Sequence, residues 1–515
     1  MSDYVLFNAN VITMDTSFPK AQLIAIKNGK IQSVSNNNYI SKLKNSKTIV
    51  IDCKGRTIIP GIIDPHLHFF GFCERLVTLD LSPRNNIRSI SDIQEKIREI
   101  ARTLPPGAWI RAGGYNEFYL AEKRHPNRWD LDRATTLHPI RLTHRSGRAH
   151  VLNSLALNYI NISKETADPE DGLIDRDIHT GEPTGLLFGM EKILAKGIPP
   201  LDPDQLEKGV RLVNNELCSS GITSFHDASP RNTLNRLKMF KKWKEDGALK
   251  PRLSISLGID GFKEYLKDSP LFRTYKNSVS VKGVKIVLHE TTGKLSPAQE
   301  ELNKILREIH RSGLQAVIHA VEEGAIESVC NAVEFVLKES PKLDHRHRIE
   351  HCSVCSPLLA RRLGSLGIMV VTQPNFIYYN GDRYLKTVPE QNLRHLYPIS
   401  TLIKNGVTVA GSSDCPVAPL NPIIGIYSAV SRKTEAGDSV LAEEKITPYE
   451  ALKMFTLNAA RATFEENIKG SIKAGKVADL VVLNGDPTTL SADELKDIKV
   501  EMTIIDGEIA WEKMS

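Results

Sequence analysis

The sequence predicts an α/β protein built around a (β/α)8 TIM barrel. Three observations predict this fold. Eight short apolar, strand-like runs follow one another, most of them separated by amphipathic helical segments, as in parallel βα units. Residues of metal-ligand type gather where these runs end, and the active sites of such barrels lie at the carboxyl ends of the strands. Both ends of the chain carry further strand-like runs, which predict a small β-domain beside the barrel.

The composition is that of an ordinary globular protein. The chain has 515 residues, of which 41% are hydrophobic and 25% charged, which excludes a disordered, collagen-like or coiled-coil chain. The net charge of +6 is spread along the sequence and gives no reason to expect a nucleic-acid partner. No apolar run reaches the ~18 residues of a spanning helix, so we expect no membrane partner. The seven scattered cysteines fit reduced thiols, and we expect a cytoplasmic protein.

The two ends of the chain are expected to form one composite β-sandwich domain, residues 1–58 plus 470–515. Strand-like runs lie at 4–15, 21–35 and 47–60, and KNGK in the second run and CKGR in the third are interpreted as turns between strands of a small antiparallel sheet. Two further runs follow at 478–487 and 500–513. Neither end has enough apolar residues for a core of its own, so we expect the two to pair.

The barrel is expected over residues 59–75 plus 220–469. Its eight predicted strands lie within residues 61–69, 221–228, 251–260, 283–290, 314–320, 347–352, 367–374 and 407–414. The gap after the first run is far longer than an ordinary βα connection. Because this gap contains strand-like and helical sequence of its own, we assign residues 76–219 to an inserted subdomain.

Histidines and an aspartate at four strand ends predict a metal centre. His66 and His68 close the first run, and residues two apart on a strand face the same side, so both imidazoles can reach one metal ion. His319 ends the fifth run, His351 the sixth and Asp414 the eighth. Each alone could be a hydrogen-bonded core residue or an ion-pair partner. Together they offer imidazole nitrogens and a carboxylate, which suit zinc or a similar ion.

Lys285 lies inside the apolar fourth run, where a free ammonium would carry a large desolvation cost. One interpretation is a lysine that is paired with an acid or points outward. The other is a neutral lysine carboxylated by carbon dioxide, whose carbamate would bridge two metal ions.

Several motifs resemble the amidohydrolase superfamily. PGIIDPHLHF, the histidines that end the fifth and sixth runs, GSSDCPV and GSIKAGKVADLVVLNGDP carry this resemblance. More narrowly, WIRAGGYN, RSGRAHVLNSLAL, EPTGLLFG, GITSFHDA, IHAVEEGAI, RIEHCS and VTQPNF resemble amidohydrolase family 3, the N-substituted formamide deformylase-like group. The resemblance spans nearly the whole chain and implies a metal-dependent barrel with a small β-sandwich made from both chain ends.

The resemblance also implies a ligand set and a cofactor. One or two divalent transition ions are expected, with zinc foremost. In the two-ion arrangement His66 and His68 bind one ion, His319 and His351 bind the other, carboxylated Lys285 lies between them and Asp414 lies at the first. A single ion on His66, His68 and Asp414 stays open as an alternative.

The implied activity is hydrolysis of a carbon–nitrogen bond in a small molecule, an amide of N-acyl or N-formyl type. Water activated by the metal would attack, and Asp414 would shuttle its proton to the leaving nitrogen. The alternatives are hydrolysis of a lactone, ester or cyclic imide, and a non-catalytic binding protein that kept the barrel. A small-molecule substrate is the expected partner, and a homodimer is one oligomeric state that the sequence leaves open.

Seven residues around the predicted barrel mouth are candidates for orienting the substrate: Tyr115, Asn116, Trp129, Arg148, His226, Gln373 and Asn375. Trp129 could instead belong to the subdomain core, Arg148 could hold a carbonyl or an acid, and His226 could support a ligand. Arg148 also stands where family members often have histidine, and Val321-Glu322-Glu323 replaces a common Gly-Asp. The family's substrates therefore cannot be transferred to this chain.

Overall fold

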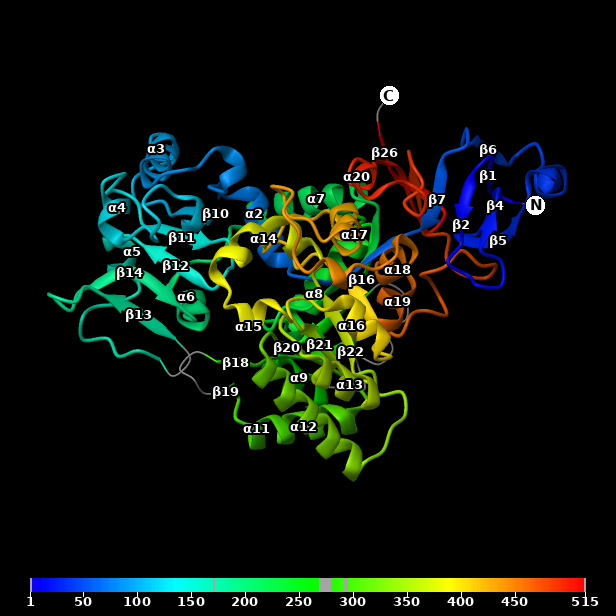
Figure 1. Ribbon diagram of the computed structural model, residues 1–515. Coiled ribbons are helices and arrows are strands. Elements are labelled where there is room, and N and C mark those ends of the chain that lie inside the picture. The colour runs from blue at the N-terminus through cyan, green and yellow to red at the C-terminus, as the bar shows by residue number, and fades with distance from the viewer. Residues whose placement is uncertain (1, 170–171, 268–278, 291–294, 514–515) are drawn as a thin grey trace. The chain divides into compact units, whose positions relative to one another are not determined.

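The chain divides into two compact units, which are described separately. The computed structural model describes residues 2–169, 172–267, 279–290 and 295–513. One unit comprises Met1–Phe69 and Val213–Ser515, and the other comprises Phe70–Leu212 (Figure 1). The finer division into three domains, which is drawn from the sequence, stays a prediction.

The first unit contains the predicted barrel. Its sheet has eight parallel strands in the order β23-β22-β21-β20-β17-β16-β15-β8. Each strand therefore pairs with the barrel strand that comes before or after it in the sequence. Seven of the eight predicted runs contain one of these strands, and the fourth run, 283–290, overlaps the second half of β17. The strands are β8 (Ile62–Leu67), β15 (Ile222–Asp227), β16 (Arg252–Leu257), β17 (Val279–Val287), β20 (Gln315–Ala320), β21 (Arg348–His351), β22 (Met369–Thr372) and β23 (Val409–Gly411).

The ring of strands is completed at its carboxyl ends. The Asp414 amide, just after β23, donates to His66 O of β8 at 3.0 Å. The His68 amide in turn donates to Cys415 O at 2.8 Å. These two bonds bring the ends of the first and last strands together, which is where the predicted ligands lie.

Amphipathic helices follow the strands. The long helix α11 buries Leu302, Leu306 and Ile309, at spacings of four and three, and ends at Gly313, whose φ of 82° suits glycine. The boundary between the two units falls inside α7 (Pro203–Ser219). The α-helices that follow it in the described residues of this part are α8 (Leu234–Glu245), α9 (Ile259–Lys267), α11 (Gln299–Ser312), α12 (Glu323–Glu339), α13 (Pro357–Ser365), α14 (Asn375–Thr387), α15 (Glu390–Leu393), α16 (Ile399–Lys404), α17 (Pro422–Ser431), α18 (Pro448–Met454) and α19 (Leu457–Ala462). A short pair of strands, β18 (His289–Glu290) and β19 (Leu295–Ser296), follows β17.

The two chain ends form two further sheets in the same unit. A six-stranded sheet has the order β26-β25-β24-β7-β2-β3, and a four-stranded sheet has the order β5-β4-β1-β6. The elements are β1 (Tyr4–Phe7), β2 (Asn10–Ile12), β3 (Lys20–Ala21), β4 (Leu23–Lys27), β5 (Lys30–Ser35), α1 (Ile40–Leu43), β6 (Ile49–Asp52), β7 (Thr57–Pro60), β24 (Leu480–Leu483), α20 (Ala492–Leu495), β25 (Val500–Ile505) and β26 (Glu508–Glu512). N-terminal β7 and C-terminal β24 are antiparallel neighbours, so the predicted pairing of the two ends is present.

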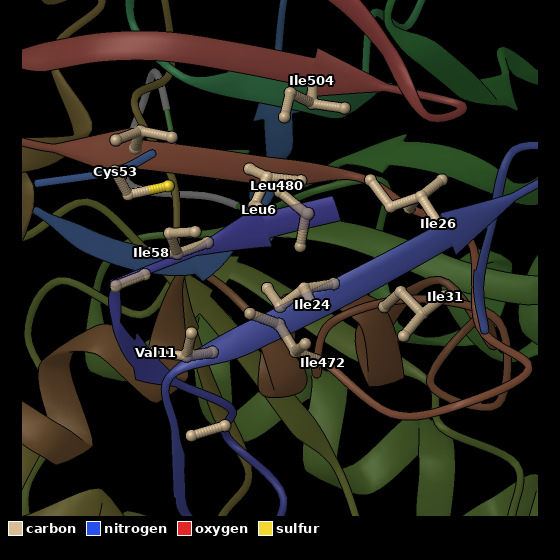
Figure 2. Packing of buried hydrophobic residues seen from close by; sticks show 14 of the residues in the cluster. Leu6, Val11, Ile24, Ile26, Ile31, Cys53, Ile58, Ile472, Leu480 and Ile504 are labelled. Atoms are coloured by element: carbon tan, nitrogen blue, oxygen red, sulfur yellow. The ribbon is translucent and has the colours of Figure 1, made fainter. Parts of the chain in front are cut away.

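One apolar cluster joins these two sheets. Leu6 and Ile24 come from the smaller sheet, while Val11, Ile58 and Leu480 come from the larger one (Figure 2). All five side chains are fully buried. Residues from both ends of the chain therefore share one core.

The predicted turns have different outcomes. KNGK is a hairpin turn between β4 and β5, with φ of 50° at Asn28 and 71° at Gly29. CKGR does not join a hairpin, and the prediction of a purely antiparallel sheet is wrong: β6 runs parallel to β1, and β7 parallel to β2. The Cys53 amide donates to Phe7 O and the Gly55 amide to Asn8 O, so this bend stays paired with the first strands while the chain passes from one sheet to the other.

The second unit is a six-stranded sheet with helices on both faces. Val151 and Leu186 pack in one cluster with residues of α3 and α4, and their neighbours Leu152 and Leu187 pack in another with α5 and α6. The sheet order is β13-β14-β12-β11-β10-β9. The elements are α2 (Phe69–Val77), β9 (Leu79–Asp80), α3 (Ile90–Ala101), β10 (Ile110–Tyr115), α4 (Arg128–Asp132), β11 (Ile140–His144), β12 (Ala149–Leu152), α5 (Ser154–Tyr159), β13 (Leu173–Arg176), β14 (Pro183–Phe188) and α6 (Glu191–Gly197). Among the helices of the described residues, none has the length and apolar character needed to cross a bilayer.

Candidate metal centre

Three predicted ligands meet at the carboxyl end of the barrel. His66 lies on β8, His351 ends β21 and Asp414 follows β23. One nitrogen or oxygen atom from each lies within 4.8 Å of the others, and all three residues are buried. Neighbouring strand ends of a closed barrel bring these residues together although they are far apart in sequence.

His68 joins this group as the two-residue spacing predicts. Its Nε2 lies 3.1 Å from Asp414 Oδ1, and His66 Nε2 lies 3.4 Å from the same oxygen. The Nδ1 of His68 is 3.1 Å from Ser229 Oγ, a hydroxyl just beyond β15. The two imidazoles therefore converge on one carboxylate oxygen.

His319 and Lys285 complete the predicted set on the neighbouring strands. The His319 ring on β20 lies 4.4 Å from the His351 ring, centre to centre, at an angle of 73°. Lys285 on β17 is opposite Val317 of β20 and is only 3% exposed. All six predicted ligands thus lie on the strands that surround this centre or just beyond the ends of those strands. Their roles as ligands stay a prediction.

The backbone near the centre has unusual conformations. His351 has φ of 77°, Cys352 of 51° and Asp414 of 56°, a region that residues other than glycine seldom adopt. On a regular strand, Glu350 and His351 would point to opposite faces. Here Glu350 contacts the His66 ring, and the His351 ring lies 5.1 Å from the His66 ring. Such conformations are typical of functional sites.

Hydrogen bonds orient two of the imidazoles. The Nδ1 of His351 donates to Gln373 Oε1 at 2.7 Å, and Gln373 Nε2 donates to Ser412 Oγ at 2.9 Å, which fixes the amide. The Nδ1 of His66 contacts the Glu350 carboxylate. The opposite nitrogen, His66 Nε2, is buried and has no hydrogen-bond partner among the described residues.

The electrostatics put these groups in the protonation states that a metal needs. Burial lowers the pKa of His66 well below its usual value and also lowers the pKa of His351, and the charge of Lys285 acts in the same direction on both. Burial alone would raise the pKa of Asp414, but the hydrogen bond from His68 and the neighbouring imidazoles bring that pKa below its usual value. Neutral imidazoles, an ionised carboxylate and an unsatisfied buried nitrogen fit a divalent transition ion.

Three of the predicted substrate-orienting residues lie in the barrel unit. His226 is enclosed, with Nδ1 2.8 Å from Ser254 Oγ and Nε2 2.8 Å from Ser256 Oγ. Gln373 holds His351, as described above. Asn375 donates through Nδ2 to Ser413 O at 3.1 Å, beside Asp414. These contacts place Gln373 and Asn375 next to ligand-type residues, and contact with a substrate stays a prediction for all three.

The other four candidates belong to the second unit. Tyr115 is fully buried, and its hydroxyl lies 2.8 Å from His125 Nδ1. Asn116 accepts the Phe118 amide at 3.2 Å. Trp129 is 37% exposed, which contradicts the alternative that it is a core residue. Arg148 is exposed. Their role toward a substrate stays a prediction.

The sequence did not point to Glu350, Arg348 or Asp64, which the structure places around the centre. Arg348 Nε donates to Glu350 Oε1 at 2.5 Å. Asp64 Oδ2 accepts the Ser413 hydroxyl at 2.5 Å, which ties β8 to the chain after β23. Burial raises the pKa of Asp64 to about 7. Charged residues inside otherwise apolar runs were the available signal, because such residues are rarely buried unless paired.

Known proteins with similar sequences and folds agree with this architecture. Residues 49–510 match the model of the amidohydrolase family. The chain is 28% identical to YtcJ of Bacillus subtilis, over 98% of each chain. It is also 28% identical to the N-substituted formamide deformylase of Arthrobacter pascens, over 100% of this chain and 99% of the relative. An uncharacterised metal-dependent hydrolase of Pyrococcus horikoshii has the same fold, with a TM-score of 0.76 at 20% identity over 95% of this chain and 99% of the other. The chain therefore belongs to the amidohydrolase family, and it is a hydrolase of carbon–nitrogen bonds.

Proposed function

We propose that this enzyme hydrolyses the carbon–nitrogen bond of a small N-acyl or N-formyl amide at a metal centre. The observation that carries the proposal is the buried group of His66, His351 and Asp414 at the carboxyl end of the barrel. Neutral imidazoles beside an ionised carboxylate are costly to bury together unless they bind something. A divalent cation is the ligand that this set of donors suits.

The proposed cofactor is one or two divalent transition ions, with zinc as the expected metal. His66, His68 and Asp414 would hold the first ion, and His319 with His351 would hold the second. When bound, such an ion lowers the pKa of a water molecule and polarises a carbonyl group.

Lys285 is proposed to carry a carboxylate on its amine. As an ammonium it would repel cations at this place, because its charge already lowers the pKa of His66 and His351. Reaction of the neutral amine with carbon dioxide forms an N–C bond and releases a proton, and the product is an anion. The change replaces a buried positive charge by a negative one beside the imidazoles.

Asp414 is proposed to move the proton during hydrolysis. Its carboxylate is ionised at neutral pH, because its pKa is lowered, and so it can accept a proton from the attacking water. Returning that proton to the departing nitrogen lets the amine leave as a neutral molecule. His66 and His68, which face the same oxygen, would hold the carboxylate in place.

Other carbonyl compounds are alternative substrates for the same chemistry. A lactone, an ester or a cyclic imide also has a carbonyl carbon that water attacks, and only the leaving group differs. A non-catalytic binding protein would not need the complete set of ligand-type residues.

A panel of substrates with an active-site variant tests the proposal. Wild-type enzyme loaded with zinc should hydrolyse N-formyl or N-acyl amines faster than matched esters and lactones. The D414N variant should lose at least about 100-fold in kcat/KM, the usual contribution of a general acid–base residue. The control is D493N, at a carboxylate that is 68% exposed and pairs with Lys433. Activity confined to lactones or esters would contradict the proposed bond, and wild-type rates in D414N would contradict the role of Asp414.

A further inference from the structure

We propose that the buried ion pair of Arg348 and Glu350 positions His66 for metal binding, so that Glu350 sets the metal affinity without touching the ion. The inference rests on the proposed metal centre and adds to it a pair of residues outside the ligand set. Arg348, Glu350 and His66 are each 0% exposed, so their polar groups need hydrogen-bond partners inside the protein.

Glu350 lies between the imidazole and the guanidinium. Its Oε2 contacts His66 Nδ1, and its Oε1 accepts Arg348 Nε at 2.5 Å. A carboxylate can only accept, so His66 Nδ1 carries the proton and Nε2 keeps its lone pair. This is the nitrogen that lies 3.4 Å from Asp414 Oδ1. Glu350 therefore selects the tautomer of His66 that a metal ion requires.

Arg348 holds the same strand by a second route. Its Nη2 donates to Pro65 O at 3.0 Å, the carbonyl directly before His66, and its Nη1 donates to Ala462 O at 2.9 Å. The planar guanidinium thus fixes both the carboxylate that holds the imidazole and the backbone that carries it. Arg348 and Glu350 are two residues apart on β21, so they point to the same face of the strand.

An amide cannot replace this carboxylate. Glu350 receives one donor on each oxygen, whereas glutamine offers one acceptor and one donor group. In E350Q either His66 or Arg348 must therefore face an amide N–H. Glutamine has nearly the same shape, so the variant changes the hydrogen-bond pattern with little change in packing.

Metal affinity is the readout that distinguishes a role of Glu350 in positioning His66 from a role in stabilising the fold alone. Metal-free wild type, E350Q, R348M/E350Q and E444Q would be titrated with Zn²⁺ against a chromophoric chelator, and the thermal unfolding of each metal-free chain would be recorded. Glu444 is a matched control, because it is buried and accepts the Thr401 amide at 2.9 Å away from the imidazoles. We expect Zn²⁺ to bind E350Q 10- to 100-fold more weakly than wild type, by the usual effect of losing such a partner, and E444Q within about twofold of wild type.

The double variant decides between two roles of Glu350. If Glu350 positions His66, R348M/E350Q stays weak in Zn²⁺ binding even where removing both charges restores thermal stability. Recovery of wild-type affinity in the double variant would overturn the inference, since Glu350 would then serve only to neutralise Arg348. Unchanged affinity in E350Q would overturn it as well, and if E350Q alone does not fold, the double variant carries the test. A wild-type chain that binds no Zn²⁺ is a different result, which overturns the metal centre itself.

Discussion

At the scale of single residues, the imidazoles of the centre use their two nitrogens differently. His66 presents Nδ1 to Glu350, and His351 presents Nδ1 to Gln373. Nε2 of His68 lies 3.1 Å from the nearest carboxylate oxygen of the centre. In the first two rings the protein has fixed one nitrogen as a donor, which leaves the other with a lone pair. Ligands oriented in this way before an ion arrives lose little freedom on binding it.

Lys285 gives a prediction at the same scale. K285A should lower the metal content of the purified enzyme, because the proposed carbamate supplies a negatively charged ligand between the two ions. We expect about one ion fewer per chain where wild type holds two, measured by inductively coupled plasma mass spectrometry. If wild type holds a single ion, we expect no change.

A second buried lysine provides the control for this prediction. Lys469 is 4% exposed and lies 2.7 Å from Glu465 Oε2, away from the imidazoles. K469A should change stability and leave metal content as in wild type. Two ions retained in K285A would show that no carbamate bridge exists.

The sequence predicts five of the six ligand-type residues because one simple rule places them, namely that active sites lie at the carboxyl ends of barrel strands. Lys285 is predicted on other grounds, because it is a lysine inside an apolar run. Glu350 escapes this rule. It precedes His351 by one residue and should face away from it, and only the positive φ of His351 brings both toward His66. A conformation of this kind is set by the surrounding tertiary structure. A charged residue inside an apolar run indicates a buried pair, but it does not show toward which side chain Glu350 points.

At the scale of elements, the segment just before β21 and the helix α11 are connected by a chain of hydrogen-bonded histidines. The Ala316 amide donates to His347 Nδ1 at 3.0 Å, so Nε2 of that ring carries the proton and donates to His310 Nδ1 at 2.9 Å. The His347 amide donates to His345 Nδ1 at 2.9 Å, and His345 Nε2 donates to Leu366 O at 2.8 Å. The three bonds that a ring Nδ1 accepts require that ring to be neutral, because an added proton would place two donors face to face.

This network predicts a loss of stability in mild acid. Burial lowers the pKa of His347 well below its usual value and also lowers the pKa of His345. The folded chain then binds fewer protons than the unfolded chain below about pH 6.5, the ordinary pKa of histidine, so the free energy of unfolding falls as the pH falls through this range. Each unit by which a folded-state pKa is lowered contributes at most about 1.4 kcal/mol.

Thermal unfolding of metal-free protein between pH 5 and pH 8 measures this effect. The Tm of wild type should fall toward pH 5, and it should fall less in H347Q, because glutamine does not titrate. H179Q, at an exposed histidine of the second unit, should keep the wild-type pH dependence. Equal pH dependence in wild type and H347Q would contradict the contribution of His347.

Strands were easier to predict than the way in which they pair. All eight barrel runs are strands, because their apolar composition and flanking helices leave few alternatives. KNGK and CKGR have similar turn residues, yet only the first joins a hairpin. At CKGR the chain is already paired with Phe7 and Asn8 from the N-terminal strands, and a partner from elsewhere in the sequence cannot be read from the turn itself.

At the scale of the whole molecule, the sheets made by the chain ends join the barrel at the end opposite to the candidate metal centre. The Gly61 amide, just before β8, donates to Asp479 O at 2.8 Å. Arg252, the first residue of β16, donates through Nε to the Asp479 carboxylate at 2.7 Å. Both contacts lie at the amino ends of barrel strands, whereas the imidazoles lie at the carboxyl ends. The chain ends can therefore brace the barrel without entering the chemistry.

Metal content is the most direct test of the proposed metal centre. The buried donors predict one to two transition ions per chain in wild-type protein, measured by mass spectrometry after removal of loosely bound metal. H66A should lose an ion together with activity, while H179A, at an exposed histidine, should keep both. A wild-type chain that is fully folded and active without any metal would contradict the central claim that these residues form a metal centre.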